Sequence, residues 1–229
     1  AKKDKKLFKR LTSKYSDLFI KDLEFLKIIP ADVYPRATDH IEEMILMISK
    51  LVKNRIAYLS KDNSVYFKLS KDIDYGRLAN LNLSDLKSTD RVINDEYSKD
   101  NPQDFSLWKS WDPEDGDIFW DSPWGRGRPG WHIECSAMSI KYLGEHFDIH
   151  CGGVDNIFPH HENELAQSIS VTNGPFVNYW MHSEHLQIKG SKMSKTNGNF
   201  YTISDLISEG FLAEEIRFVM LSAHYRTKL

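Results

Sequence analysis

The sequence predicts an α/β fold organised around one strand, a glycine turn and a helix. Residues 147–168 (FDIHCGGVDNIFPHHENELAQS) begin as an apolar strand, break at Gly152-Gly153 and restart as a helix. This geometry lets backbone approach a nucleotide, with the ligand beyond the carboxyl end of the strand. A helical stripe of apolar residues over 41–52 and a short apolar strand at 65–67 supply the rest of the mixed pattern. We therefore expect a small-ligand site after the central strand.

The other elements follow from local patterns. Apolar residues at helical spacing, with lysines on the opposite face, predict a helix over residues 1–28 that Pro30 ends. Asp39 and Glu42 resemble a capping pair for the helix that carries the apolar stripe. The stretch 72–100 is polar and rich in turn residues, so we expect an exposed insertion. Further helices and strands are expected at residues 133–143, 176–182, 185–188, 204–209 and 214–221.

Composition describes an ordinary globular chain of 229 residues, 41% hydrophobic and 28% charged, enough for one domain or one and a half. A net charge of −3 means that any contact with nucleic acid needs a local basic patch. The lysines between Lys2 and Arg10 offer one, although such a cluster is also typical of a solvated helix face. Only two cysteines and no recognisable leader or membrane-length apolar run predict a reducing, cytoplasmic compartment.

A metal site is indicated by three residue types that suit zinc. His160 and Glu164 are four residues apart and share one helix face, and Cys135 lies upstream in GWHIECSAMS. Sulfur, imidazole and carboxylate together suit zinc better than magnesium or calcium. The other interpretation is that Cys135 is a small buried hydrophobe and that His160 and His161 cap a helix.

Two further stretches have a composition that suits a binding site. Five tryptophans lie in a span broken by glycine and proline, which suits rigid pocket walls but also ordinary core anchors: Trp108, Trp111, Trp120, Trp124 and Trp131. The loop at 190–199 (GSKMSKTNGN) holds Lys192 and Lys195, and it suits a mobile lid whose ammonium groups neutralise a polyphosphate. A solvated surface loop has the same composition.

These motifs jointly resemble the cysteinyl-tRNA synthetases, a family of class I aminoacyl-tRNA synthetases. KMSKT at residues 192–196 resembles the KMSKS signature loop of that class. GWHIECSAM and HCGGVDNIFPHHENE resemble the family's zinc and adenylate segments. The likeness continues in YPRATDHI, SPWGRGRPGW, NYWMHS and SAHYR, so it covers nearly the whole chain.

The resemblance implies a partial class I Rossmann-type catalytic domain with a connective insertion. It divides the chain into a helical segment (1–60), the insertion (61–125) and the second half of the Rossmann domain (126–229). It further implies a ligase that activates L-cysteine with ATP and Mg²⁺ and transfers it to tRNA(Cys), acting as a monomer and away from membranes. No HIGH-like sequence is present, so we expect a fragment that is inactive in isolation.

Carried over residue by residue, the resemblance assigns roles to matching positions. The zinc ligands of the family match Cys135, His160 and Glu164. Its ATP-binding lysine matches Lys195, with Lys192 as the companion.

Two further pairs of residues match the substrate sites of the family. The segment that receives the adenosine matches Gly153 and Asp155. The cysteine pocket matches Trp131, with His161 close by.

Four alternatives stay open. Cys151 could replace a zinc ligand. A related ligase could deliver cysteine to an amino sugar. A zinc hydrolase could use Glu162 as its base, although the helix lacks the HExxH order. A non-catalytic module could hold zinc and nucleotide without turnover.

Overall fold

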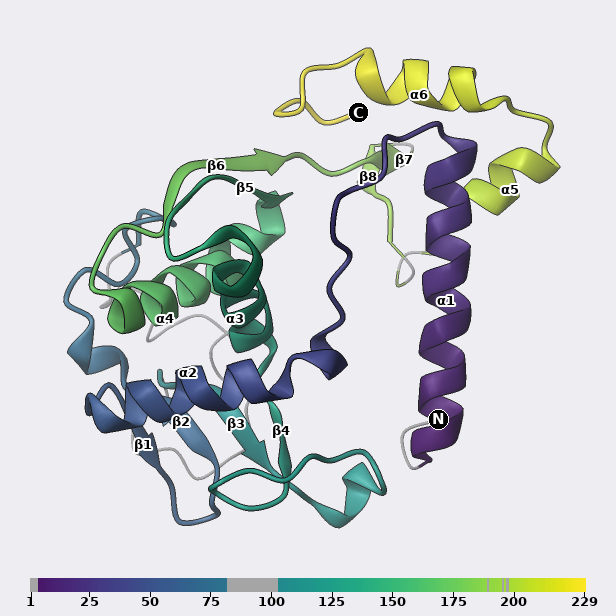
Figure 1. Cartoon of the computed structure of the whole chain (residues 1–229). Helices are drawn as coiled ribbons and strands as arrows, with labels where there is room; N and C mark the ends of the chain where they lie inside the picture. Colours follow the sequence, from purple (N-terminus) through teal and green to yellow (C-terminus); the bar gives the residue numbers. More distant parts are fainter. Residues whose placement is uncertain (1–3, 82–102, 189, 195, 197) are drawn as a thin grey trace.

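The computed structural model describes residues 4–81, 103–188, 190–194, 196 and 198–229. Figure 1 shows a helix-and-sheet body, with α1 (Lys5–Phe25) standing beside it and α5 and α6 near one end of α1. Within these ranges, no helix has both the length and the apolar character needed to cross a membrane.

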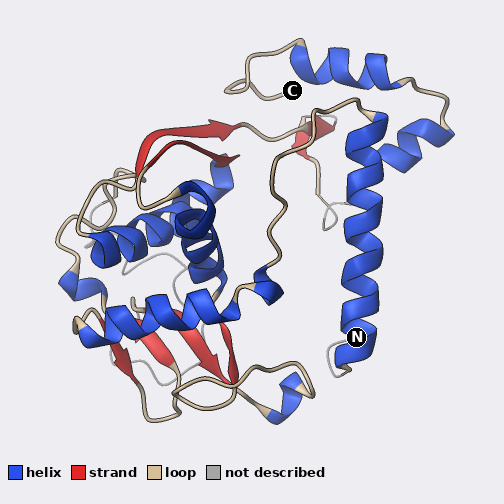
Figure 2. Cartoon of the chain, in the orientation of Figure 1, coloured by secondary structure: helices blue, strands red, loops and turns tan. Residues whose placement is uncertain are grey.

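A four-stranded antiparallel sheet forms one side of the body. Its order is β1-β2-β3-β4, with bounds Ala57–Leu59, Val65–Phe67, Phe105–Ser110 and Gly127–Pro129. Helix α2 (Ile41–Lys53) lies along this sheet (Figure 2) and buries the predicted apolar stripe against it. Phe67, Leu107 and Trp108 are fully buried beneath the helix layer. The largest hydrophobic cluster of the described chain therefore lies between the sheet and α2, and buried residues of the later helices α3 and α4 complete it.

A βαβ unit forms the other side of the body. The strands β5 (Phe147–Gly153) and β6 (Val177–Ser183) are parallel, and α4 (Glu162–Thr172) lies on the connection between them. Two neighbouring parallel strands need such a crossover because the chain leaves the first strand at one edge of the sheet and must enter the second at the opposite edge. Helix α3 (Trp131–Leu143) contacts both α2 and α4. It thus joins the βαβ unit to the antiparallel sheet.

The loop at residues 190–199, which carries Lys192 and is called the lysine loop below, follows the βαβ unit and leads to the last helices. The short strands β7 (Gln187–Ile188) and β8 (Ser191–Lys192) pair as a hairpin, and α5 (Ile203–Ser208) and α6 (Ala213–Leu221) come next. Helix α1 has no buried residue. Its carboxyl end is held by Arg217 of α6, whose Nη1 donates to the backbone oxygen of Leu26 over 2.7 Å.

Most predicted elements are confirmed, with two corrections. Helix α1 ends at Phe25 rather than at Pro30, because Lys27 adopts a left-handed conformation (φ 53°). The Asp39 and Glu42 capping pair is wrong, since the N-cap residue of α2 is His40 and no side chain caps this end. The His40 ring instead contacts the Arg36 oxygen at 2.7 Å and the Tyr142 hydroxyl at 2.8 Å.

The predicted insertion and segment boundaries have different outcomes. Residues 72–81 are not simply exposed, because Tyr75 and Gly76 are buried, and the part of the insertion at 82–100 lies outside the described residues. The division at residues 60/61 and 125/126 stays a prediction. The antiparallel sheet contains strands on both sides of each boundary.

The packing of α2 on the sheet predicts a sharp contrast between two of its residues. Ile48 is fully buried, whereas Leu46 is 70% exposed on the same helix. We expect Ile48→Ala to lower the free energy of unfolding by about 2–5 kcal/mol, because it leaves a cavity in the core. Leu46→Ala should change it by less than about 0.5 kcal/mol. Urea unfolding measures both, and equal losses would contradict the packing described.

Candidate functional site

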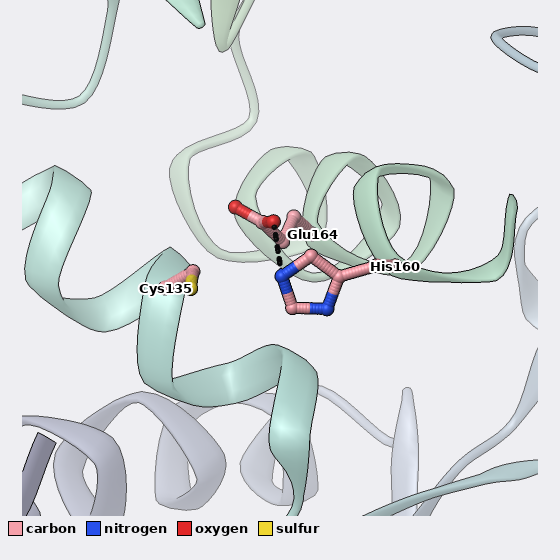
Figure 3. A group of neighbouring side chains, drawn as sticks. All are labelled: Cys135, His160 and Glu164. Carbon is pink, nitrogen blue, oxygen red and sulfur yellow. Dashed lines mark ion pairs between the residues drawn. The ribbon is translucent and has the colours of Figure 1, made fainter. Parts of the chain in front are cut away.

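The site is centred on the carboxylate of Glu164, which is fully buried in α4. Its Oε2 accepts a hydrogen bond from His150 Nε2 of β5 over 3.0 Å. Its Oε1 lies 3.0 Å from His160 Nε2, one turn earlier along the chain. Figure 3 shows Cys135, on the neighbouring helix α3, beside this pair. Three separate elements therefore bring polar side chains to one carboxylate.

Two groups of side chains have the spacing for a metal ion. The ligand atoms of Cys135, His160 and Glu164 all lie within 4.8 Å of one another, and so do those of His150, His161 and Glu164. In both groups a carboxylate oxygen faces an imidazole nitrogen at 3.0 Å, Oε1 facing His160 Nε2 and Oε2 facing His150 Nε2. Oε1 is buried, and its contact with His160 lacks hydrogen-bond geometry. The sulfur distinguishes the first group, whose thiolate, imidazole and carboxylate donors fit zinc.

Burial and neighbouring charge shift the pKa values of these groups in opposite directions. Burial would raise the pKa of Glu164, but the hydrogen bond from His150 and the adjacent imidazoles lower it to about 2. Burial raises the pKa of the Cys135 thiol to about 12, with a further contribution from the charges of Glu164 and Glu134. These shifts favour an ionised carboxylate beside a protonated thiol, and a bound cation would favour the thiolate.

Imidazole and indole rings surround the buried carboxylate. His132 Nδ1 and His160 Nδ1 are 2.9 Å apart, and His161 Nδ1 and His182 Nε2 are 2.8 Å apart. Trp131 is exposed and stacks on His160, with ring centroids 4.3 Å apart. Burial lowers the pKa of His161 to about 4, despite the opposing charge of Glu164. His161 is therefore neutral at pH 7 and can both donate and accept a hydrogen bond.

Three histidines of this site were missed as candidates from the sequence: His132, His150 and His182. All three lie inside the motifs that carry the family resemblance, in GWHIEC, FDIHCGG and NYWMHS. For His150 and His182 the missing information was the strand register, which places His150 opposite Trp180 and Gly152 opposite His182. Such cross-strand neighbours are separated by about 30 residues and leave no periodic signal in the sequence. For His132 the missing information was the packing of α3 beside α4, which brings its ring to His160.

The glycine turn brings together the other predicted residues. A Cβ at Gly152 would lie 2.5 Å from His161 Cε1, and one at Gly153 would lie 2.6 Å from Asp155 Oδ1. Gly152 therefore lets the buried His161 ring approach the backbone closely, whereas the Asp155 carboxylate beside Gly153 is half exposed and has room to move. Lys192 Nζ contacts Asp155 Oδ2 at 3.1 Å, so the lysine loop meets the glycine turn. Lys195 lies outside the described residues.

Several candidates have other places in the fold. Trp108 is fully buried in the main cluster and Trp124 packs against it, so these two are core residues rather than pocket walls. Trp120 packs against the same cluster and also lines a pocket beside α1. Cys151 is exposed and belongs to neither metal group of the described chain. Its role as a replacement zinc ligand is therefore not supported.

Glu162 is the base that the hydrolase alternative requires, and its carboxylate already has other partners. It accepts hydrogen bonds from the backbone nitrogens of Gly76 (2.9 Å) and Ala79 (2.8 Å). Glu162 is also absent from both metal groups of the described residues. Its observed role is to anchor the 72–80 turn to the start of α4.

A parallel βαβ unit whose glycine turn meets a lysine loop is the framework of a class I aminoacyl-tRNA synthetase catalytic domain. Residues 1–229 match the family model described as "tRNA synthetases class I (C) catalytic domain", and the chain belongs to this family. The predicted resemblance and fold class are thereby confirmed.

The particular relatives are named cysteine–tRNA ligases. The chain is 56% identical over 216 residues to the one from Chlamydia muridarum, covering 94% of this chain and 46% of the relative. It is 57% identical over 220 residues to the one from Brachyspira hyodysenteriae, covering 95% and 46%. The chain thus spans about half the length of the curated relatives it matches.

Solved structures support the fold alone. Methionyl-tRNA synthetase from Mycobacterium tuberculosis, in complex with methionyl-adenylate, matches with a TM-score of 0.67 at 16% identity, covering 96% of this chain and 53% of that one. A putative arginyl-tRNA synthetase from Campylobacter jejuni matches with a TM-score of 0.55 at 15% identity, covering 95% and 39%.

The anchoring role of Glu162 predicts a loss of stability when the carboxylate is removed. Glu162→Ala leaves the Gly76 and Ala79 amides without their acceptor, so the free energy of unfolding should fall by about 2–4 kcal/mol. Glu162→Gln keeps one acceptor oxygen and should lose less. Urea unfolding measures both, with Glu145→Ala at an exposed position as control. An unchanged midpoint for Glu162→Ala would contradict the anchor.

Proposed function

We propose that this chain forms part of a ligase that activates L-cysteine with ATP and transfers it to tRNA(Cys). The observation that carries the proposal is the grouping of Cys135, His160 and Glu164, with their ligand atoms within 4.8 Å of one another. The names of the relatives support the same activity. They favour tRNA over an amino sugar as the acceptor of the cysteinyl group.

In this proposal, Cys135, His160 and Glu164 hold a zinc ion. Zinc held by these residues would bind the thiol of the substrate as a thiolate, for which the hydroxyl of serine is a far poorer ligand. His150 keeps the Glu164 carboxylate oriented through its hydrogen bond to Oε2. Trp131 and His161 flank His160 and would contact the bound amino acid.

The activation step joins the substrate carboxylate to the α-phosphate of ATP, with loss of pyrophosphate. The attacking oxygen belongs to the substrate, so the protein has to position the reactants and neutralise charge. Gly153 and Asp155 receive the adenosine in this scheme, and Lys192 and Lys195, with Mg²⁺, neutralise the phosphates. The contact between Lys192 and Asp155 supports this arrangement because it brings the two halves of the ATP site together. A monomeric state and a cytoplasmic location stay predictions.

The proposed zinc site makes a ligand-specific prediction. Cys135→Ala, His160→Ala and Glu164→Ala should each weaken zinc binding by at least about 100-fold, because each removes one donor of the group. Metal analysis of the dialysed full-length gene product measures this, with circular dichroism to confirm folding.

Cys151→Ala is the matched control, because it also removes a thiol but at an exposed position outside the group. Full zinc retention by Cys135→Ala with loss in Cys151→Ala would reverse the assignment.

The proposed activity predicts amino-acid-dependent exchange of pyrophosphate into ATP by the full-length gene product. Cysteine should support exchange and serine should not, because only the thiol binds zinc strongly. Lys192→Ala should lower kcat/KM for ATP by about 100-fold, as expected for loss of a charged transition-state contact. Exchange of equal rate with serine would exclude selection by a metal. A protein that binds zinc and shows no exchange would be a non-catalytic module.

A further inference from the structure

The loop that carries Lys192 is shaped by a side chain that the family motif does not assign. Asn199 lies just beyond the KMSKT motif and is partly buried. Its Oδ1 accepts a hydrogen bond from the Ser194 backbone nitrogen over 2.9 Å, and its Nδ2 donates to the Lys192 backbone oxygen over 3.2 Å. One side-chain amide thus bridges two backbone groups, one on either side of Met193.

The two hydrogen bonds fix the orientation of the amide as well as its position. A backbone N–H can only donate and a backbone oxygen can only accept, so Oδ1 must face Ser194 and Nδ2 must face Lys192. A carboxylate lacks the donor, and a hydroxyl can donate and accept but only through a single oxygen atom. The site therefore suits a side chain that carries a donor and an acceptor on separate atoms, as the amide of Asn199 does.

The Asn199 hydrogen bonds hold the Lys192–Ser194 backbone on one side, and the β7–β8 hairpin holds it on the other. Lys192 pairs with Gln187 in the β7–β8 ladder, and Met193 N donates to Leu186 O over 2.9 Å. Asn199 adds the return half of the loop to this frame. The Lys192 side chain leaves the frame toward Asp155, which its Nζ contacts at 3.1 Å. Lys192 is about half exposed, so side-chain packing contributes little to its direction, and the backbone frame decides where it starts.

We propose that Asn199 is a positioning residue for the phosphate-binding loop, holding the Lys192–Ser194 backbone so that Lys192 is aimed at the nucleotide site. The proposal rests on the proposed function for its kinetic consequences, since Lys192 acts on ATP there. Asn199 itself touches neither substrate nor metal ligand in its described hydrogen bonds. Its removal should therefore affect ATP and leave the cysteine pocket unchanged.

The test compares Asn199→Ala with Asn178→Ala in pyrophosphate exchange by the full-length gene product. Asn178 is a matched control, because its amide also makes two hydrogen bonds, to His146 Nε2 (2.8 Å) and Asp148 Oδ1 (3.0 Å), away from the loop. We expect Asn199→Ala to lower kcat/KM for ATP by about tenfold with KM for cysteine unchanged, and Asn178→Ala to match the wild type. Unchanged ATP kinetics in Asn199→Ala, or an equal loss for ATP and cysteine, would overturn the proposal.

A second measurement does not depend on catalysis. Amide hydrogen exchange at Ser194 should be about tenfold faster in Asn199→Ala than in the wild type, because the amide loses its acceptor. Asn199→Asp keeps an acceptor for Ser194 and lacks the donor for Lys192, so Ser194 should stay protected. If the wild type shows no exchange of pyrophosphate, the proposed function fails while this readout still decides the role of Asn199. Equal protection of the Ser194 amide in Asn199→Ala and in the wild type would refute the role of the Asn199 hydrogen bond.

Discussion

The burial of one ionised carboxylate is the constraint on which this site depends. Glu164 has no exposed surface, and a charge in that position is stable only if nearby groups donate to it or neutralise it. His150 of β5 meets this need with a hydrogen bond to Oε2, and His160 Nε2, from the turn before α4, lies 3.0 Å from Oε1. The His160 contact lacks hydrogen-bond geometry, so Oε1 has no hydrogen-bond donor among the described residues. The buried carboxylate that pairs with His150 of β5 therefore also presents Oε1 as an acceptor next to Cys135.

The glycine turn follows from this arrangement. His161 has to lie next to the end of β5 to reach His182 on β6, and a Cβ at Gly152 would occupy the place of its ring. Gly153 leaves room for the Asp155 carboxylate in the same way. Two adjacent glycines thus serve two different side chains, one directed toward the buried histidines and the other toward the lysine loop. This is why the turn can connect the histidines around Glu164 with the lysine loop.

Local sequence signals predicted most elements, because helices and strands depend on near neighbours. The apolar stripe of α2 and the strand, turn and helix at 147–168 are such cases. The four-residue spacing of His160 and Glu164 likewise predicted their contact at 3.0 Å. Contacts between distant segments were not accessible: His150 reaches Glu164 through strand pairing, and Glu162 binds the backbone of a turn more than 80 residues earlier. Cys135 was proposed from the chemistry of its sulfur and supported by the family motif, since no local spacing relates it to α4.

The ion pair between Lys192 and Asp155 is weak enough to open when a ligand binds, although it brings the lysine loop to the glycine turn. Both side chains are about half exposed, and exposed pairs contribute only about 0–1 kcal/mol. In the proposed reaction, the two groups have different ligands, a phosphate for the ammonium and the adenosine for the carboxylate. Opening the pair therefore costs little compared with the charge-assisted contacts that a polyphosphate offers. The precision of the loop has to come from its backbone, where hydrogen bonds are not exchanged when the ligand enters.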